Sequence, residues 1–129
     1  MTVEALIERV EYWQGILGLT HWTIKVELVE ECDAGPHNSA AVRPSVYYTT
    51  ADLQVTESAM EKDEYERDAI IVHELIHILF RDLTEASHVP LKFLNRDVAE
   101  LYSDRLDFET EGVVDVLARS IAALSTQAW

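Results

Sequence analysis

The segment His73-Glu74-Leu75-Ile76-His77 carries the residues whose types and spacing could do chemistry. Two histidines four residues apart fall on one face of an α-helix, so both imidazoles can reach a single metal ion. A glutamate beside the first histidine can then take the proton of a metal-activated water. Zinc suits such a site because it accepts neutral imidazole nitrogens and keeps an open coordination position in catalytic sites. The pattern indicates a zinc-dependent hydrolase, with a peptidase as the first expectation.

The neighbours of this motif predict that its helix is buried. They form the most apolar run of the chain: Ile70, Ile71, Val72, Leu75, Ile76, Ile78, Leu79 and Phe80. A helix that is apolar nearly all round is normally buried, and a buried polar group without a partner costs about 1–3 kcal/mol. A metal would supply such partners at once. The alternative is an exposed helix that carries two histidines by chance.

A third protein ligand is expected because catalytic zinc sites usually have three protein ligands and a water. The extension with a glycine and a third histidine is missing after His77. Glu111 is the preferred candidate, because it shares one helix face with Asp115 four residues later. Glu109 is the second candidate and His88, in a segment expected to be a loop, is the third. The alternative for these acids is a solvated helix N-terminus, where the dipole favours negative charge.

Hydrophobic periodicity predicts the elements that position these residues. The expected helices cover residues 3–17, the motif segment from between 60 and 68 to about 81, a segment from about 91, and a last helix from about 110 to 124. The expected strands cover residues 22–28 and 46–55, with a short strand around 40–43. Loops are expected at 31–39 and 84–90. This order predicts an α+β fold: N-terminal helix, small mixed or antiparallel sheet, motif helix and C-terminal helices.

Composition predicts one domain over residues 1–129, with 48% hydrophobic and 26% charged residues. The chain has no apolar run of about 18 residues, and the first residues do not resemble a secretory signal. The single cysteine, Cys32, cannot form an internal disulfide. These features predict a cytoplasmic protein.

The net charge of the chain limits the classes of partner that are expected. The net charge is −14, and 10 basic residues are scattered among 24 acidic ones. Nucleic acid and anionic membranes are therefore not expected as partners, because both require clustered Lys and Arg. A peptide or protein substrate is expected instead, and the oligomeric state stays open.

The motif and its surroundings resemble the small gluzincin-type metallopeptidases of phages and bacteria. The resemblance rests on Ala69-Ile70-Ile71-Val72 before the motif and on the segment from Glu111 to Ala118 far after it. It implies a minimal zincin-like metallopeptidase domain whose zinc is held by His73, His77 and a glutamate on a later helix, here Glu111. It also implies that Glu74 acts as general base and then as general acid while a peptide bond is hydrolysed.

Two further expectations follow from that chemistry. A second donor usually helps to stabilise the oxyanion, and the candidates are Tyr47, Tyr48, Tyr102, Arg105 and His88. By analogy with zincins, the strand around residues 51–55 is expected to be the edge strand that binds substrate by β-augmentation. The alternative function is a non-catalytic binding or regulatory protein on a zincin-like scaffold. The complete motif favours the enzyme, because a scaffold without catalysis has no chemical need for Glu74.

Overall fold

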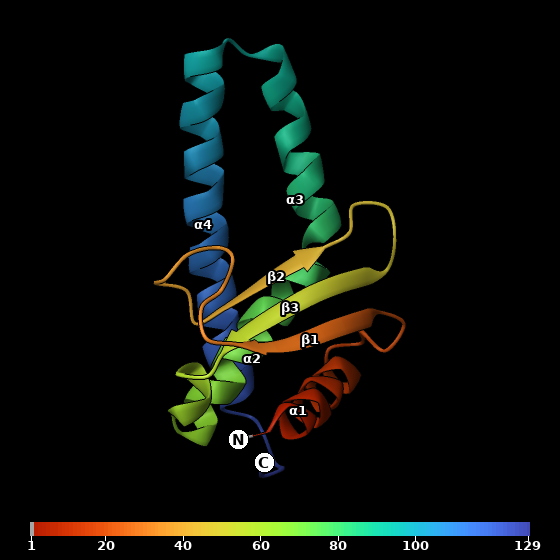
Figure 1. Ribbon diagram of the computed structural model, residues 1–129. Helices are drawn as coiled ribbons and strands as arrows, with labels where there is room; N and C mark the ends of the chain where they lie inside the picture. The colour runs from red at the N-terminus through yellow and green to blue at the C-terminus, as the bar shows by residue number, and fades with distance from the viewer. Residues whose placement is uncertain (1) are drawn as a thin grey trace.

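The structure, a computed structural model that describes residues 2–129, is an α+β fold in which helices cover one face of a small sheet (Figure 1). The elements are α1 (Val3–Ile16), β1 (Thr23–Val29), β2 (Ala40–Pro44), β3 (Thr50–Thr56), η1 (Ala59–Glu61), α2 (Glu64–Leu79), α3 (Arg81–His88), η2 (Val89–Phe93) and α4 (Arg96–Ala122). The expected α+β class is confirmed. The sheet is mixed, one of the two expected forms.

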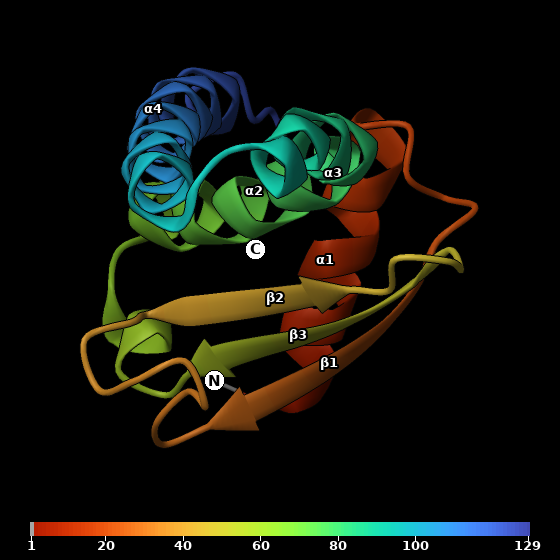
Figure 2. The same cartoon turned by 90° about the horizontal axis from the view of Figure 1, so that it is seen from above.

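The sheet has the strand order β1-β3-β2, so β3 is central and β2 is a free edge (Figure 2). Strand β1 pairs with β3 in parallel and β2 pairs with β3 antiparallel. The central strand alternates: Leu53 and Val55 are fully buried, whereas Asp52 is exposed. The expectation that residues 51–55 form the edge strand is wrong. The alternation of apolar and polar residues shows which face of a strand is buried. Which strands lie side by side depends on the connections between them.

The core lies between the inner face of the sheet and helices α1 and α2. Helix α1 buries Leu6, Val10 and Trp13 at helical spacing. It ends at Ile16 with Leu17 as its C-cap, and the following Gly18, whose φ is +71°, lets the chain turn while the N–H of Leu19 donates to the carbonyl of Gln14 at 2.8 Å. The predicted first helix is confirmed, and of the two glycines proposed as its stop, Gly18 is the one used.

Helix α2 carries the HExxH motif and is the most buried helix of the fold. It begins at Asp63, whose side chain accepts a hydrogen bond from the N–H of Glu66 at 2.9 Å. Ile71, Val72 and Leu75 are fully buried toward the sheet and α1. The prediction of a buried motif helix is confirmed.

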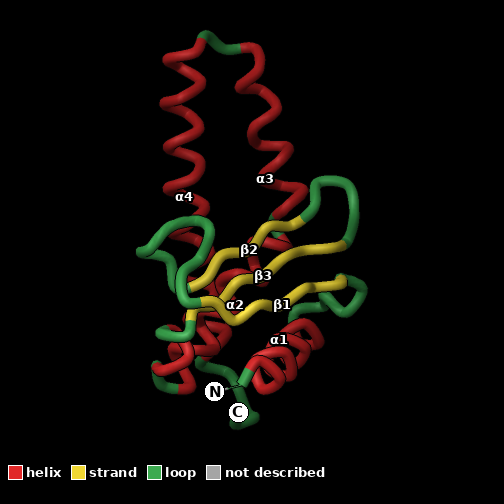
Figure 3. Tube along the Cα trace, viewed as in Figure 1, coloured by secondary structure: helices red, strands yellow, loops and turns green. Residues whose placement is uncertain are grey.

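The C-terminal region differs from the sequence prediction (Figure 3). The segment expected to be a loop at 84–90 is largely helix α3, and the two helices expected from about 91 and about 110 are one 27-residue helix, α4. Thr84 and Ser87 read as turn residues, yet the Ser87 hydroxyl donates back to the Leu83 carbonyl within the helix. Helix α4 begins at Asn95, whose side chain accepts from the N–H of Val98. Among the described residues, no helix is both long and apolar enough to cross a membrane.

Helix α3 and the first half of α4 form an arm that projects beyond the sheet (Figure 1). Helix α3 has no buried residue, and the buried residues of α4 (Val114, Ala118 and Ala122) all lie in its second half, where it packs on α2. This packing decides which part of α4 reaches the motif helix.

A buried ion pair joins α1 to the motif helix. Arg9 donates two hydrogen bonds to the carboxylate of Asp68, from Nε to Oδ1 and from Nη2 to Oδ2, each at 2.7 Å. The indole N–H groups of Trp13 and Trp129 also donate to Asp68, at 2.7 and 3.1 Å. Because every polar group here is paired, the network holds the start of α2 in place without an uncompensated charge. Sequence reasoning did not find this pair.

Candidate metal centre

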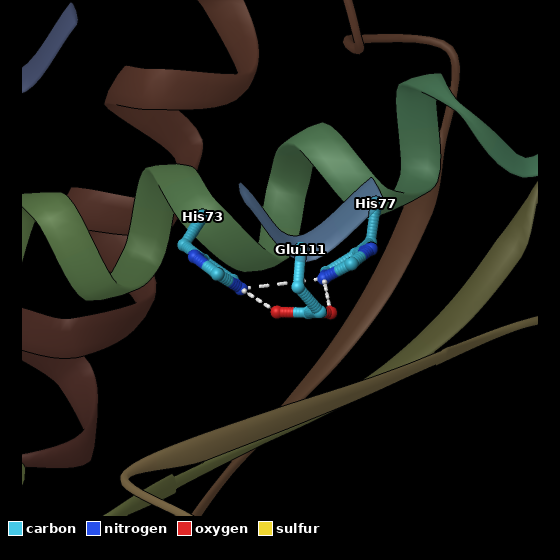
Figure 4. Close-up of side chains that lie close together, drawn as sticks. All are labelled: His73, His77 and Glu111. Atoms are coloured by element: carbon cyan, nitrogen blue, oxygen red, sulfur yellow. Dashed lines mark hydrogen bonds and ion pairs between the residues drawn. The ribbon is translucent and has the colours of Figure 1, made fainter. Parts of the chain in front are cut away.

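Helices α2 and α4 bring His73, His77 and Glu111 together, although Glu111 lies more than thirty residues further along the chain (Figure 4). One oxygen of Glu111 is 3.1 Å from Nε2 of His73, and the other is 2.9 Å from Nε2 of His77. The two histidine Nε2 atoms are 3.3 Å apart. The three side chains that sequence reasoning preferred as ligands therefore meet at one point.

The spacing of these atoms can be compared with that of metal ligands. Three N or O donors at about 2.0–2.2 Å from one zinc ion, at tetrahedral angles, lie about 3.3–3.6 Å from one another. The two histidine nitrogens are 3.3 Å apart, which lies within this range, whereas the contacts of 3.1 and 2.9 Å reach two different oxygens of Glu111 and are hydrogen-bond distances. Two imidazoles and one carboxylate are a donor set that zinc accepts. The three side chains thus form a group that could hold a metal ion, and their chemistry suits zinc.

The electrostatics keep His77 in the neutral form that a metal ligand needs. Burial lowers the pKa of His77, and the charge of the nearby Glu111 opposes this effect without cancelling it. Glu111 itself has a side chain that is 57% exposed, so an ion at this point would face open solvent on one side.

Glu74 lies beside the triad and at the free edge of the sheet. Burial raises its pKa to about 7, the negative charge of Glu111 adds to this increase, and a hydrogen bond from the backbone N–H of Val42 in β2 opposes it. A carboxyl group with this pKa can both accept and release a proton near neutral pH. The position and protonation of Glu74 therefore match those of a general base.

A second carboxylate lies behind His73. Oδ1 of Asp115 is 3.9 Å from Nδ1 of His73, on the ring side opposite the nitrogen that faces Glu111. Asp115 is held in turn by Nε of Arg119 at 3.2 Å. At this distance Asp115 makes an electrostatic contact with the Nδ1 side of His73 and no hydrogen bond, and a shorter contact of the same kind would favour the tautomer that leaves Nε2 free to bind a metal.

A groove crosses the triad along strand β2. One hollow, of about 480 Å³, extends from the triad toward Pro44, Val46 and helix α3. A second, of about 240 Å³, extends the other way toward the 37–39 loop and Arg119. Both are lined by His73 and Glu74, so the two hollows adjoin at the candidate metal centre and are together called the groove.

The free edge of β2 faces this groove with backbone groups that do not pair with another strand. The N–H of Thr56 donates to the carbonyl of Ser39, and the N–H of Ser45 donates to the carbonyl of Thr50, so the odd-numbered residues of β2 pair with β3. By alternation, the backbone groups of Ala40 and Val42 point away from β3. The hydrogen bond from Val42 to Glu74 agrees with this orientation.

The other residues proposed from the sequence lie elsewhere. Glu109 forms an ion pair with Arg105 at 2.8 Å on the surface of α4. His88 faces Asp107 at 3.5 Å and the Thr84 carbonyl at 2.7 Å. Neither belongs to the group formed by His73, His77 and Glu111. The oxyanion candidates Tyr47, Tyr48, Tyr102, Arg105 and His88 also do not line the groove.

Polar residues that sequence reasoning missed line the groove instead. Asn38 lines both hollows, His37 lines the smaller one and Arg81 the larger one. The only available signal was their place directly before a strand or directly after the motif helix. That signal is weak because loops are commonly polar.

Comparison of the chain with known protein families, with curated proteins and with solved structures found no match.

Proposed function

We propose that this protein is a zinc-dependent metallopeptidase with a zincin-like domain. The observation that carries the proposal is the convergence of His73, His77 and Glu111 beside Glu74. A chance cluster of two histidines and an acid would not need a neighbouring carboxyl group whose pKa lies near 7. The proposal gives all four residues a role in the same reaction.

His73, His77 and Glu111 would hold the zinc ion. When bound, zinc supplies Lewis acidity, which activates water and polarises a carbonyl group. Asp115 would keep the His73 ring in the orientation that presents Nε2 to the ion. The buried contacts of α2 and of the second half of α4 keep the two helices in register, so the ligands are preorganised.

Glu74 would move the proton. As a carboxylate it accepts a proton from the attacking water, and as a carboxylic acid it donates that proton to the departing amine. In the metal-free site the pKa of Glu74 is about 7, and the charge of a bound zinc ion would lower it and favour the carboxylate form that accepts the proton. The hydrogen bond from Val42 keeps the carboxyl group at the edge of the groove.

An extended peptide would bind along the free edge of β2. The outward N–H and carbonyl of Ala40 and the outward carbonyl of Val42 can pair with a substrate strand, whose scissile bond would then lie near Glu74. Pro44 follows two residues later and has no N–H to donate, which is tolerated at an edge.

The test is metal content by mass spectrometry together with cleavage of a peptide mixture. We expect about one zinc per chain in the wild type, its loss in His77→Ala and weaker retention in Glu111→Ala. Glu109→Ala is the matched control, because it removes a neighbouring glutamate that does not face the triad. Glu74→Gln should keep its zinc and lose cleavage.

Two results would overturn the proposal. The first is no zinc in the wild type even after zinc is added back. The second is bound zinc with peptide cleavage that is absent from the wild type or unchanged in Glu74→Gln. Bound zinc without any cleavage would favour a binding or regulatory protein on the same scaffold.

A further inference from the structure

Three consecutive apolar residues are exposed where the groove ends. Val46, Tyr47 and Tyr48 follow strand β2, and their exposed fractions are 52, 87 and 71%. Val46 lines the larger hollow together with His73, Glu74 and His77. A run of three exposed apolar residues is unfavourable in a folded protein unless it serves a function.

The loop that carries these residues is held firmly. Nη1 of Arg81 donates to the carbonyls of Ser45 and Tyr48, at 3.1 and 2.7 Å. The Arg81 guanidinium lies 4.6 Å from the centre of the Trp22 ring, and its side chain is only 16% exposed. The hydroxyl of Ser45 also accepts from the N–H groups of Tyr47 and Tyr48. The fold therefore fixes the backbone of this loop while leaving its aromatic side chains open to solvent.

The position of the loop relates it to a peptide in the groove. Val46 lies four residues beyond Val42, whose N–H reaches Glu74. At about 3.3 Å per residue, this is at most about 13 Å along the strand direction. A side chain about three to four residues from a bond beside Glu74 would reach Val46, and the two exposed tyrosines follow Val46 directly where the groove ends. Rigid aromatic groups bind apolar partners at little cost in conformational entropy.

We propose that Val46, Tyr47 and Tyr48 form a specificity subsite that binds a large apolar side chain of the peptide, about three to four residues from the scissile bond. This inference rests on the proposed peptidase function, because it assumes that a peptide lies along β2. It adds a preference for substrates with an apolar or aromatic residue at that distance. The exposed tyrosine rings serve as binding surface, and their hydroxyl groups are not required.

The test measures binding separately from cleavage. The protein is zinc-loaded Glu74→Gln, and the probes are fluorescent alanine-rich peptides in which one phenylalanine is moved stepwise along the chain. Fluorescence anisotropy should show one position that improves affinity about tenfold over the peptide without phenylalanine. Adding Tyr47→Ser and Tyr48→Ser should abolish that gain, whereas Tyr47→Phe and Tyr48→Phe should keep it.

The matched control is Phe93→Ser with Leu101→Ser, which removes exposed apolar side chains from the arm instead of from the loop. It should keep the gain in affinity. The inference is overturned if no position of phenylalanine improves binding, or if the serine variant keeps the gain. Cleavage of the same peptides by the zinc-loaded wild type tests the proposed function separately. Phenylalanine-dependent binding without cleavage would reject the peptidase and leave the subsite standing.

Discussion

Replacing Glu74 by glutamine is expected to stabilise the metal-free protein, and to do so more strongly as the pH rises. The pKa of Glu74 is raised from 4.5 to about 7 in the folded protein. A carboxyl group with a raised folded-state pKa contributes stability that is fully present below pH 4.5 and is lost as the pH rises through about 7. Above that pH, the folded protein holds an ionised carboxylate in a partly buried site beside Glu111.

The magnitude follows from the size of this increase. At about 1.4 kcal/mol per pKa unit, the loss of stability at pH 8 is roughly 3 kcal/mol. At pH 5 the loss of stability is only about 1 kcal/mol, because most of it occurs at higher pH. Glutamine is neutral at every pH and has nearly the same shape. The advantage of Glu74→Gln over the wild type should therefore grow by roughly 2 kcal/mol between pH 5 and pH 8.

The assay is urea unfolding in the presence of EDTA at several pH values between 5 and 8. Glu11→Gln is the control, because it removes the same charge from an exposed position on α1 and so corrects for the net charge of −14. If the difference between Glu74→Gln and the wild type is the same at pH 5 and pH 8, the reasoning about a raised pKa is refuted.

Three further predictions concern the fold and the site. Asp68→Ala should lower the free energy of unfolding by about 3–5 kcal/mol, because it leaves the buried Arg9 guanidinium without its counter-charge; a loss below about 1 kcal/mol would contradict the role of this pair. Gly18→Ala should destabilise by about 1–2 kcal/mol because φ is +71° there, whereas Gly15→Ala, inside α1 with open space around the new Cβ, should stabilise by up to about 1 kcal/mol. Thermal unfolding of the two variants tests both effects, and melting temperatures that shift in the same direction would refute this explanation. Asp115→Asn should weaken zinc affinity about 10- to 100-fold in a competition assay with a chelating dye; unchanged affinity would show that Asp115 does not orient His73.

Local pattern was sufficient where one element carries the whole signal. The i, i+4 spacing of His73 and His77 places both on one helix face, whatever the rest of the chain does. The apolar run around them predicts burial of that helix, and the alternation in β1 predicts a strand with one buried face. These expectations needed no knowledge of distant contacts, and the structure agrees with them.

The local sequence pattern gave a wrong prediction where two conformations of a segment have similar local energies. Thr84 and Ser87 suit a turn as well as a helix, and in the structure the Ser87 hydroxyl donates to the Leu83 carbonyl inside the helix. The break expected near residue 110 does not occur: Thr110 and Gly112 both lie within α4, and Gly112 does not take the positive φ that would end a helix. The strand at the free edge was also misassigned, since neighbours in a sheet are set by chain crossing.

By itself, the sequence determined that His73 and His77 share one face of α2, that this helix is buried and that the fold is α+β, because each depends on spacing within one segment. Only the tertiary structure decided that Glu111, rather than Glu109 or His88, faces the two histidines. The turn of α4 that lies opposite His73 is set by the packing of Val114 and Ala118 on α2, and a shift of two residues would point a side chain roughly 200° away. The pKa of Glu74 was likewise beyond the sequence, because it depends on burial and on a charge brought close by a separate helix.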